Sequence, residues 1–189
     1  VGTNTEIIAL IVTVSSGLSI GANVLIAKHV GRTEAEKLPA AVQTAMRLAM
    51  CIGVIGLLLG QIAAAPLLRL IRTPEEIFDA AALYLRIYML GYPFLLLYDF
   101  GAACLRARGD SRYPFLALLL SGFANVGLNL LFTAGLRMGV AGVAIATDLS
   151  TMLSAFLVLR RLAKDAVFRF AILNQRSARN GVWSILKTG

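Results

Sequence analysis

The chain has 189 residues, of which 58% are hydrophobic and only 15% charged, with a mean hydropathy of +0.79 and a formal net charge of +8. This composition excludes an intrinsically disordered chain and argues against a soluble domain, in which about a quarter of the residues are charged. A nucleic-acid-binding protein would also be basic, but with its charge in a stripe on a water-soluble fold, so the remaining class is an integral membrane protein, with lipid and not nucleic acid around it.

Five apolar stretches are long enough to cross a bilayer, whose hydrocarbon core needs about 20 helical residues. Strands would alternate apolar and polar residues in segments of about ten, so each stretch is predicted to be a helix. The expected fold class is an all-α integral membrane protein, a polytopic bundle with five visible transmembrane helices. The spans cover about residues 7–27, 48–68, 87–105, 114–136 and 138–159.

Most charged residues lie in the connections between these stretches. The connections 28–37, 106–112 and 160–189 hold 3, 3 and 7 Lys or Arg residues, whereas the opposite side holds four. Basic connections stay in the cytoplasm, so the tail is predicted to be cytoplasmic, with Val1 outside. An outside amino terminus without a signal sequence indicates one missing helix upstream and a six-helix unit.

Two further local features follow from the same pass along the chain. The run Thr73-Pro74-Glu75-Glu76 is typical of a helix start, with Thr as the cap, Pro at the first position and acids in the first turn. Residues 160–189 mix basic and apolar residues, which favours an amphipathic linker lying at the cytoplasmic membrane surface. An ordinary loop ordered by contacts with the rest of the protein is the alternative. Residues 1–159 then form a partial transmembrane lobe.

Polar residues inside the spans are candidates for binding. Asn125 and Asn129 are four residues apart and share one helix face, and their amide oxygens could coordinate a cation such as Na⁺. The Thr147 hydroxyl, with the backbone carbonyl of Val143 one turn earlier, could complete an oxygen shell. Hydrogen bonds between helices, worth roughly 1 kcal/mol each, are the alternative role.

Asp99 and Asp148 are the only acids within the spans. A carboxylate there costs about 2.5–3.5 kcal/mol on insertion scales, so it is expected to face a cavity, a partner or an ion path. Asp99 lies beside Gly91-Tyr92-Pro93, a run that bends helices, and could carry a proton. Asp148 is next to Thr147, about 100° further around the helix. Each could instead pair with a neighbouring helix. The chain contains no catalytic constellation, so no enzyme is predicted.

Several strings together resemble the multidrug and toxic compound extrusion (MATE) family, over most of the chain to about residue 161. The Arg-x-Arg-Gly-Asp loop followed by Pro114 is the most specific of them. The strings are Val1 to Thr5, Ser15 to Asn23, Tyr84 to Ile87, Gly91 to Phe94, Leu105 to Pro114 and Gly139 to Thr147.

The resemblance implies a transporter with twelve helices in two six-helix lobes. Such a transporter is expected to exchange Na⁺ or H⁺ for small organic, often cationic, drugs and to need no cofactor. This chain would match helices two to six of the amino-terminal lobe, so that helix one and the carboxy-terminal lobe are its missing partners. The expected location is the plasma (inner) membrane. A lipid-linked saccharide flippase of the same superfamily would want a cavity rich in Arg or Lys, which the spans lack. A truncated remnant that does not transport is a further alternative.

The resemblance also implies a cation site, formed in the family by an acid on helix one, polar residues of helix five, and a carbonyl and a Thr of helix six. The last two groups fall on Asn125, Asn129, Val143 and Thr147. Asp99 stands where relatives commonly carry Asn, so it could add a second acid or take over proton transfer. Asp148 also departs from the family pattern, and its role is left open.

Overall fold

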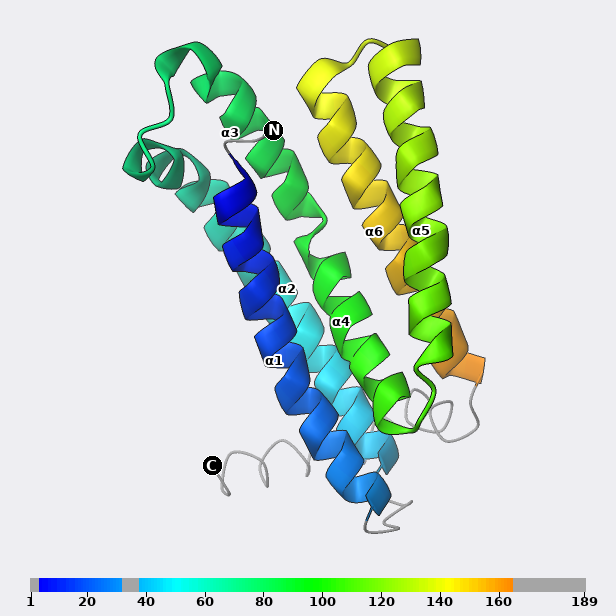
Figure 1. The fold of residues 1–189 in the computed structure, drawn as a ribbon. Helices are drawn as coiled ribbons and strands as arrows, with labels where there is room; N and C mark the ends of the chain where they lie inside the picture. Colours follow the sequence, from blue (N-terminus) through cyan, green and yellow to red (C-terminus); the bar gives the residue numbers. More distant parts are fainter. Residues whose placement is uncertain (1–3, 32–37, 165–189) are drawn as a thin grey trace.

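The computed structural model describes residues 4–31 and 38–164, and the regular elements within them are all helical (Figure 1). This confirms the predicted all-α class. The amphipathic linker was predicted over residues 160–189, and its residues 165–189 lie outside the described residues, as does most of the 28–37 connection. In chain order, the elements are α1 (Thr5–Gly31), α2 (Leu38–Leu70), α3 (Glu75–Leu90), α4 (Tyr92–Ala107), α5 (Arg112–Leu130), η2 (Leu131–Gly135) and α6 (Gly139–Lys164).

The described helices run along the bundle in alternating directions (Figure 1). Four helices are individually long and apolar enough to span a membrane, and α3 with α4 make a fifth span that is bent by 44°. The third span therefore differs from the single helix expected over 87–105. It begins at Glu75 and breaks at Gly91, so Arg86 lies inside a helix rather than at its start. Pro93 explains the break, because proline cannot donate the hydrogen bond that would continue the α3 ladder into α4.

Helices extend beyond the apolar stretches that mark them in the sequence. α2 starts at Leu38 rather than near residue 48, and α6 continues to Lys164 rather than 159. Hydropathy marks the part of a helix in lipid, whereas hydrogen bonding continues into the polar surroundings. Residues 131–135 form the turn of π-helix η2 at the end of the fourth span.

The helix start predicted at residues 73–76 is right in its acids and wrong in its cap. Glu75 and Glu76 occupy the first turn of α3, but Pro74 holds the cap position and makes no side-chain cap. The hydroxyl of Thr73 is buried without a hydrogen-bond partner among the described residues. The cause is the path of the chain: the Thr73 backbone N–H bonds back to Leu68 and closes α2 instead.

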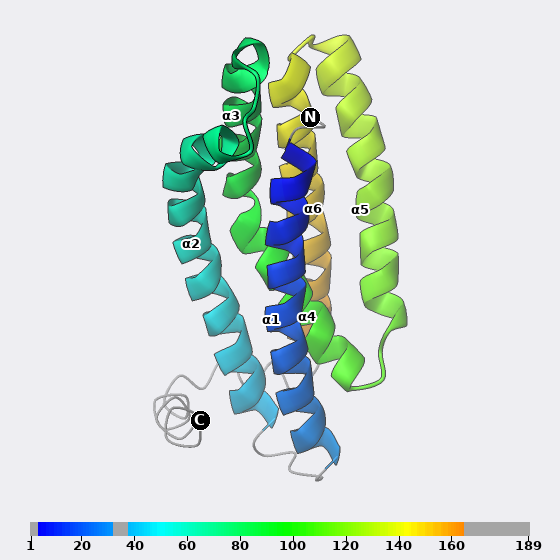
Figure 2. The same ribbon diagram turned by 60° about the vertical axis from the view of Figure 1, so that its left-hand side comes forward.

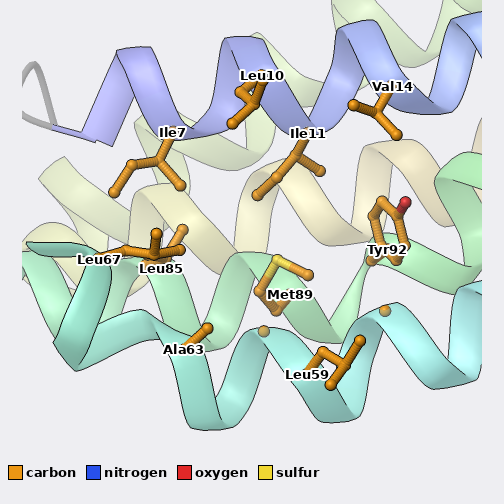
Figure 3. Close-up of a pocket in the computed structure, with 12 residues that line it drawn as sticks. Ile7, Leu10, Ile11, Val14, Leu59, Ala63, Leu67, Leu85, Met89 and Tyr92 are labelled. Carbon is orange, nitrogen blue, oxygen red and sulfur yellow. The ribbon is translucent and has the colours of Figure 1, made fainter.

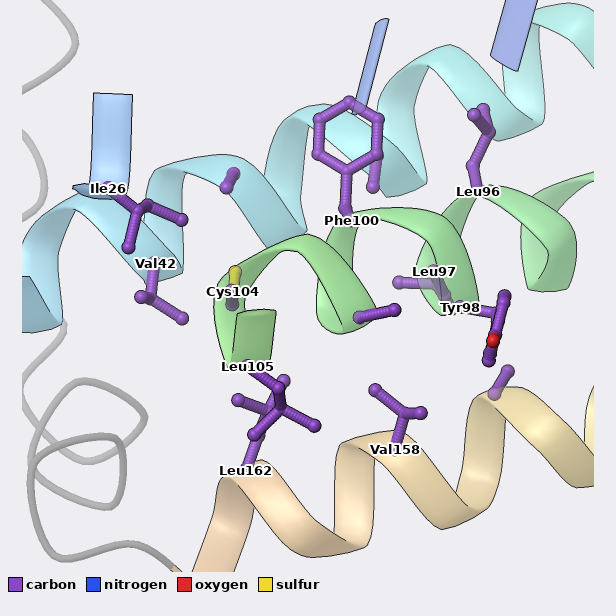
Figure 4. Packing of buried hydrophobic residues seen from close by; sticks show 14 of the residues in the cluster. Ile26, Val42, Leu96, Leu97, Tyr98, Phe100, Cys104, Leu105, Val158 and Leu162 are labelled. Carbon is purple, nitrogen blue, oxygen red and sulfur yellow. The ribbon is translucent and has the colours of Figure 1, made fainter. Parts of the chain in front are cut away.

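α4 is the central helix of the bundle. It packs against α1, α2 and α6, and Figure 2, turned by 60°, also shows it between these helices. In the main hydrophobic cluster, Phe100 and Leu96 of α4 point toward α2, while Val158 and Leu162 of α6 pack on the other side (Figure 4). Most of α4 is therefore apolar and buried. Asp99 is its one acid, which places a carboxylate in the middle of the bundle.

Candidate functional site

A groove with a volume of about 470 Å³ lies between α1, α4, α5 and α6. It brings together three of the sequence-predicted site residues, which come from three different helices: Asp99 from α4, Asn125 from α5 and Thr147 from α6. The packing of α4 against α6 and of α5 against α6 makes this meeting possible. The other lining residues are Val12, Leu95, Tyr98, Leu118, Ser121, Gly122, Ser150, Thr151 and Ser154.

A stripe of hydroxyls on α6 forms one wall of the groove. The Oγ atoms of Ser150 and Ser154 donate to the Thr147 and Thr151 carbonyls at 2.8 Å, and Thr147 and Thr151 donate to carbonyls one turn earlier at 2.9 Å. Because each hydroxyl proton is used within the helix, each oxygen keeps lone pairs free to accept. The stripe is therefore a row of oxygen acceptors, suited to a cation or a hydrogen-bond donor.

Asn125 links the hydroxyl stripe to α5. Its Nδ2 donates to Ser150 Oγ across 3.1 Å, and its Oδ1 accepts from Asn129 Nδ2 at 2.9 Å. Asn129 does not line the groove, and it holds Asn125 from one turn further along α5. The structure therefore divides the predicted Asn pair into one side chain in the groove and one behind it.

The carboxylate of Asp99 has one oxygen without a partner. Asp99 Oδ2 is buried and accepts no hydrogen bond from the described residues. A buried carboxylate oxygen without a donor is unfavourable by a few kcal/mol unless a cation or a proton satisfies it. One carboxylate together with neutral oxygens matches the charge and the ligand preference of a hard monovalent cation.

The two remaining candidates are not in the groove. The Val143 carbonyl accepts a hydrogen bond from the Thr147 hydroxyl at 2.9 Å. The two groups that were expected to be separate ligands are therefore hydrogen-bonded to each other. Asp148 lies against Gly91, at the break between α3 and α4. Thr147 and Asp148 are adjacent in sequence, yet only Thr147 contributes to the groove.

The groove contains hydroxyls that were not predicted from the sequence: Ser121, Ser150, Thr151 and Ser154. A signal for most of them was present, because positions 147, 150, 151 and 154 follow the i, i+3, i+4, i+7 spacing of one helix face. Ser121 is separated by four residues from Asn125 and shares its face of α5 in the same way.

A second groove, of about 260 Å³, lies between α1, α2 and the break region (Figure 3). Ile7, Ile11 and Val14 of α1 face Leu59 and Leu67 of α2 across it, with Leu85, Met89 and Tyr92 at its floor. Its lining is almost entirely apolar. It therefore offers no ligands for an ion, and the oxygen-lined groove is the better candidate site.

Comparison with known proteins shows the family to which this chain belongs. The family model described as MatE matches residues 1–131. The chain belongs to the MATE family. Members of this family are transporters rather than enzymes. The family, the helical fold and the absence of enzyme chemistry were thus predicted correctly from the sequence.

The relatives and the solved structures agree. The probable multidrug resistance protein YoeA of Bacillus subtilis is 34% identical over 154 residues, covering 79% of this chain and 33% of YoeA. The chloroplastic protein DETOXIFICATION 45 of Arabidopsis thaliana is 34% identical over 128 residues, covering 67% of this chain and 23% of that protein. A MATE crystal structure in a bent conformation superposes with a TM-score of 0.84 at 25% identity, covering 88% of this chain and 38% of that one. The match thus covers between 23% and 38% of the length of these MATE relatives.

Proposed function

We propose that this MATE chain belongs to a secondary active multidrug efflux transporter that exchanges Na⁺ or H⁺ for organic, often cationic, compounds. The observation that carries the proposal is the unpartnered, buried Oδ2 of Asp99 in a groove walled by oxygen acceptors. The names of the relatives point to multidrug resistance. The choice between Na⁺ and H⁺ is left to the experiment below.

In this proposal the coupling ion satisfies Asp99 and contacts the oxygens of Asn125 and Thr147. The three side chains lie on three helices, so an ion bound among them favours one arrangement of α4, α5 and α6 over another. Coupling requires that ion and drug stabilise different conformations, because a ligand shifts an equilibrium only by its differential affinity. The groove supplies an ion site that can distinguish two packings of these helices.

The charge of the groove favours this activity over the flippase alternative. Among the described residues that line it there is one acid, Asp99, and no Lys or Arg. An acid surrounded by oxygen acceptors suits a cation, whereas a pyrophosphate headgroup is bound by cationic side chains and N–H donors. The proposed substrate class is therefore the organic cation, exchanged for a smaller cation.

The experiment begins with the DNA that flanks this segment, which gives the full-length gene product to be expressed. Dye efflux is then measured in everted vesicles under an imposed Na⁺ gradient at constant pH, and separately under a pH gradient without Na⁺. We expect Asp99→Asn to reduce efflux by about tenfold or more under whichever gradient drives it, the size of a typical coupling free energy. Asp79→Asn is the matched control, because Asp79 is an acid of the same span outside the groove.

Efflux by Asp99→Asn at the rate of the unmutated protein under both gradients would overturn the ion site. Stop codons on both sides of the segment would instead favour the remnant reading, because five spans with one ion groove lack a second lobe to move against. A reporter fused after residue 189 tests the proposed topology. We expect the reporter to lie on the cytoplasmic side of the inner membrane. A reporter on the opposite side would reverse that assignment.

A further inference from the structure

Asp148 is the one acid of α6, and the proposed ion site does not use it. Its carboxylate lies against Gly91, where the third span breaks. A Cβ atom built on Gly91 would stand 2.3 Å from Asp148 Oδ1 and 2.8 Å from its Cγ. The carboxylate of α6 therefore fills the space that a side chain at position 91 would need.

The glycine at this position is explained by space rather than by backbone conformation. Gly91 has φ −75° and ψ −14°, values that any residue adopts. It is buried, and its carbonyl accepts the backbone N–H groups of Phe94 and Leu95 at 3.0 Å, which starts α4. Its own N–H donates to the Tyr88 carbonyl at 3.1 Å, at the end of α3. The missing side chain at Gly91, where the helix breaks, therefore leaves the space that the Asp148 carboxylate of α6 occupies.

α6 also packs along α3, where the rings of Tyr84 and Tyr88 stack with centroids 6.3 Å apart. Thr147, the residue before Asp148, lines the ion groove. Two consecutive residues of α6 therefore contact the groove and the break between α3 and α4.

We propose that Asp148 is a positioning residue, whose carboxylate seats α6 on the break at Gly91 and so ties the bend of the third span to the wall of the ion groove. Asp99 lies two turns beyond the break on α4, so the bend sets where the acid stands relative to Thr147. The packing part of this proposal is independent of the proposed function. Its consequence for transport rests on that function.

The packing part is tested by compensation between the two positions in the full-length gene product. Gly91→Ala puts a methyl group into the carboxylate, and overpacking of this kind is expected to lower the melting temperature by about 4 °C or more. In Gly91→Ala/Asp148→Ala the carboxylate is gone, and the nearest remaining atom is the Cα of residue 148 at 3.4 Å, an ordinary contact. We expect the double variant to melt within about 1 °C of Asp148→Ala alone.

The control pair is Gly127→Ala with Asp148→Ala. A Cβ on Gly127 would meet nothing within 4 Å, so these two changes should add without compensation. Should Gly91→Ala fail to fold, recovery of a folded protein in the double variant supports the proposal. An additive loss in the Gly91 pair, or failure of that double variant to fold, overturns it.

The role in transport is tested with Asp148→Asn. Asn keeps the shape of the side chain and an oxygen that can take the place of Asp148 Oδ1 against Gly91, but it does not carry a negative charge. A positioning residue tolerates this change, so dye efflux should stay within about twofold of the unmutated rate, whereas Asp148→Ala should lower it by about fivefold or more. Loss of efflux in a folded Asp148→Asn would overturn positioning. A wrong assignment of the ion site would be detected separately, because the Asp99→Asn variant would then keep the dye efflux of the unmutated protein.

Discussion

Asp110 and Arg161 join the connection between α4 and α5 to the last turn of α6. Oδ2 of Asp110 accepts hydrogen bonds from Nε and Nη2 of Arg161, both at 3.3 Å. Its Oδ1 accepts the backbone N–H of Tyr113 at 3.1 Å, in the first turn of α5, and the Arg161 guanidinium lies 5.5 Å above the Tyr113 ring. One carboxylate therefore holds the start of one helix and the end of another.

This geometry separates the two roles of Asp110. The ion pair is half exposed, with 49% of the Arg161 side chain accessible, so Arg161→Ala should cost at most about 1 kcal/mol. Asp110→Ala also removes the acceptor for the first turn of α5 and should cost about 1 kcal/mol more. Thermal melts of the purified protein measure both losses. High salt should reduce the ion-pair contribution in both variants and leave the extra loss of Asp110→Ala unchanged. Equal melting temperatures for the two variants would contradict the capping role.

The Asn pair of α5 should show a graded effect on transport. Asn125→Ala removes a groove side chain and leaves Ser150 without its donor, so ion-driven efflux should fall about tenfold or more, as for Thr147→Ala. Asn129→Ala removes only the side chain that supports Asn125 and should have the smaller effect. Dye efflux, normalised to the amount of membrane-inserted protein, makes the comparison. An Asn129→Ala variant as impaired as Asn125→Ala would place both side chains in direct contact with the ion.

Glycines of α2 mark its closest approach to the break region. A Cβ on Gly53 would stand 2.7 Å from the backbone Cα of Pro93, whereas one on Gly60 would meet the flexible end of Met89 at 2.4 Å. Overpacking costs about 1–3 kcal/mol, more where the obstacle is backbone and less where a methionine can move aside. We expect Gly53→Ala to lower the melting temperature more than Gly60→Ala. Gly127→Ala, with open space around it, is the control and should not destabilise.

Arg72, in the turn that follows α2, has a backbone conformation that residues other than glycine rarely adopt. Its φ is +55°, in the left-handed region, and the following Thr73 N–H closes the turn onto the Leu68 carbonyl. Glycine adopts this conformation without strain, so Arg72→Gly should stabilise the protein by about 1 kcal/mol. Arg86→Gly is the matched control, because it places glycine inside α3 and should destabilise by about 1 kcal/mol. A lower melting temperature for Arg72→Gly would contradict the strain.

Hydropathy along the chain was sufficient to identify the membrane class and the five spans, because insertion into lipid depends on the local run of apolar residues. The family was identified from particular strings, such as the Arg-x-Arg-Gly-Asp loop followed by Pro114. The residue types of Gly91-Tyr92-Pro93 marked the bend. The helix ends were less predictable. The hydrogen-bond ladder that extends α2 and α6 past their apolar stretches leaves no hydropathy signal.

Which polar residues share a site was decided only by the tertiary structure. Helical spacing placed Asn125 and Asn129 on one face, yet only Asn125 lines the groove, since Asn129 bonds to it from behind. Thr147 and Asp148 are neighbours in sequence, and the packing of α6 between α5 and the bent third span sends one to the groove and the other to Gly91. The physical reason is that a sequence specifies directions around a single helix axis, whereas the neighbour met in each direction depends on how separate helices pack.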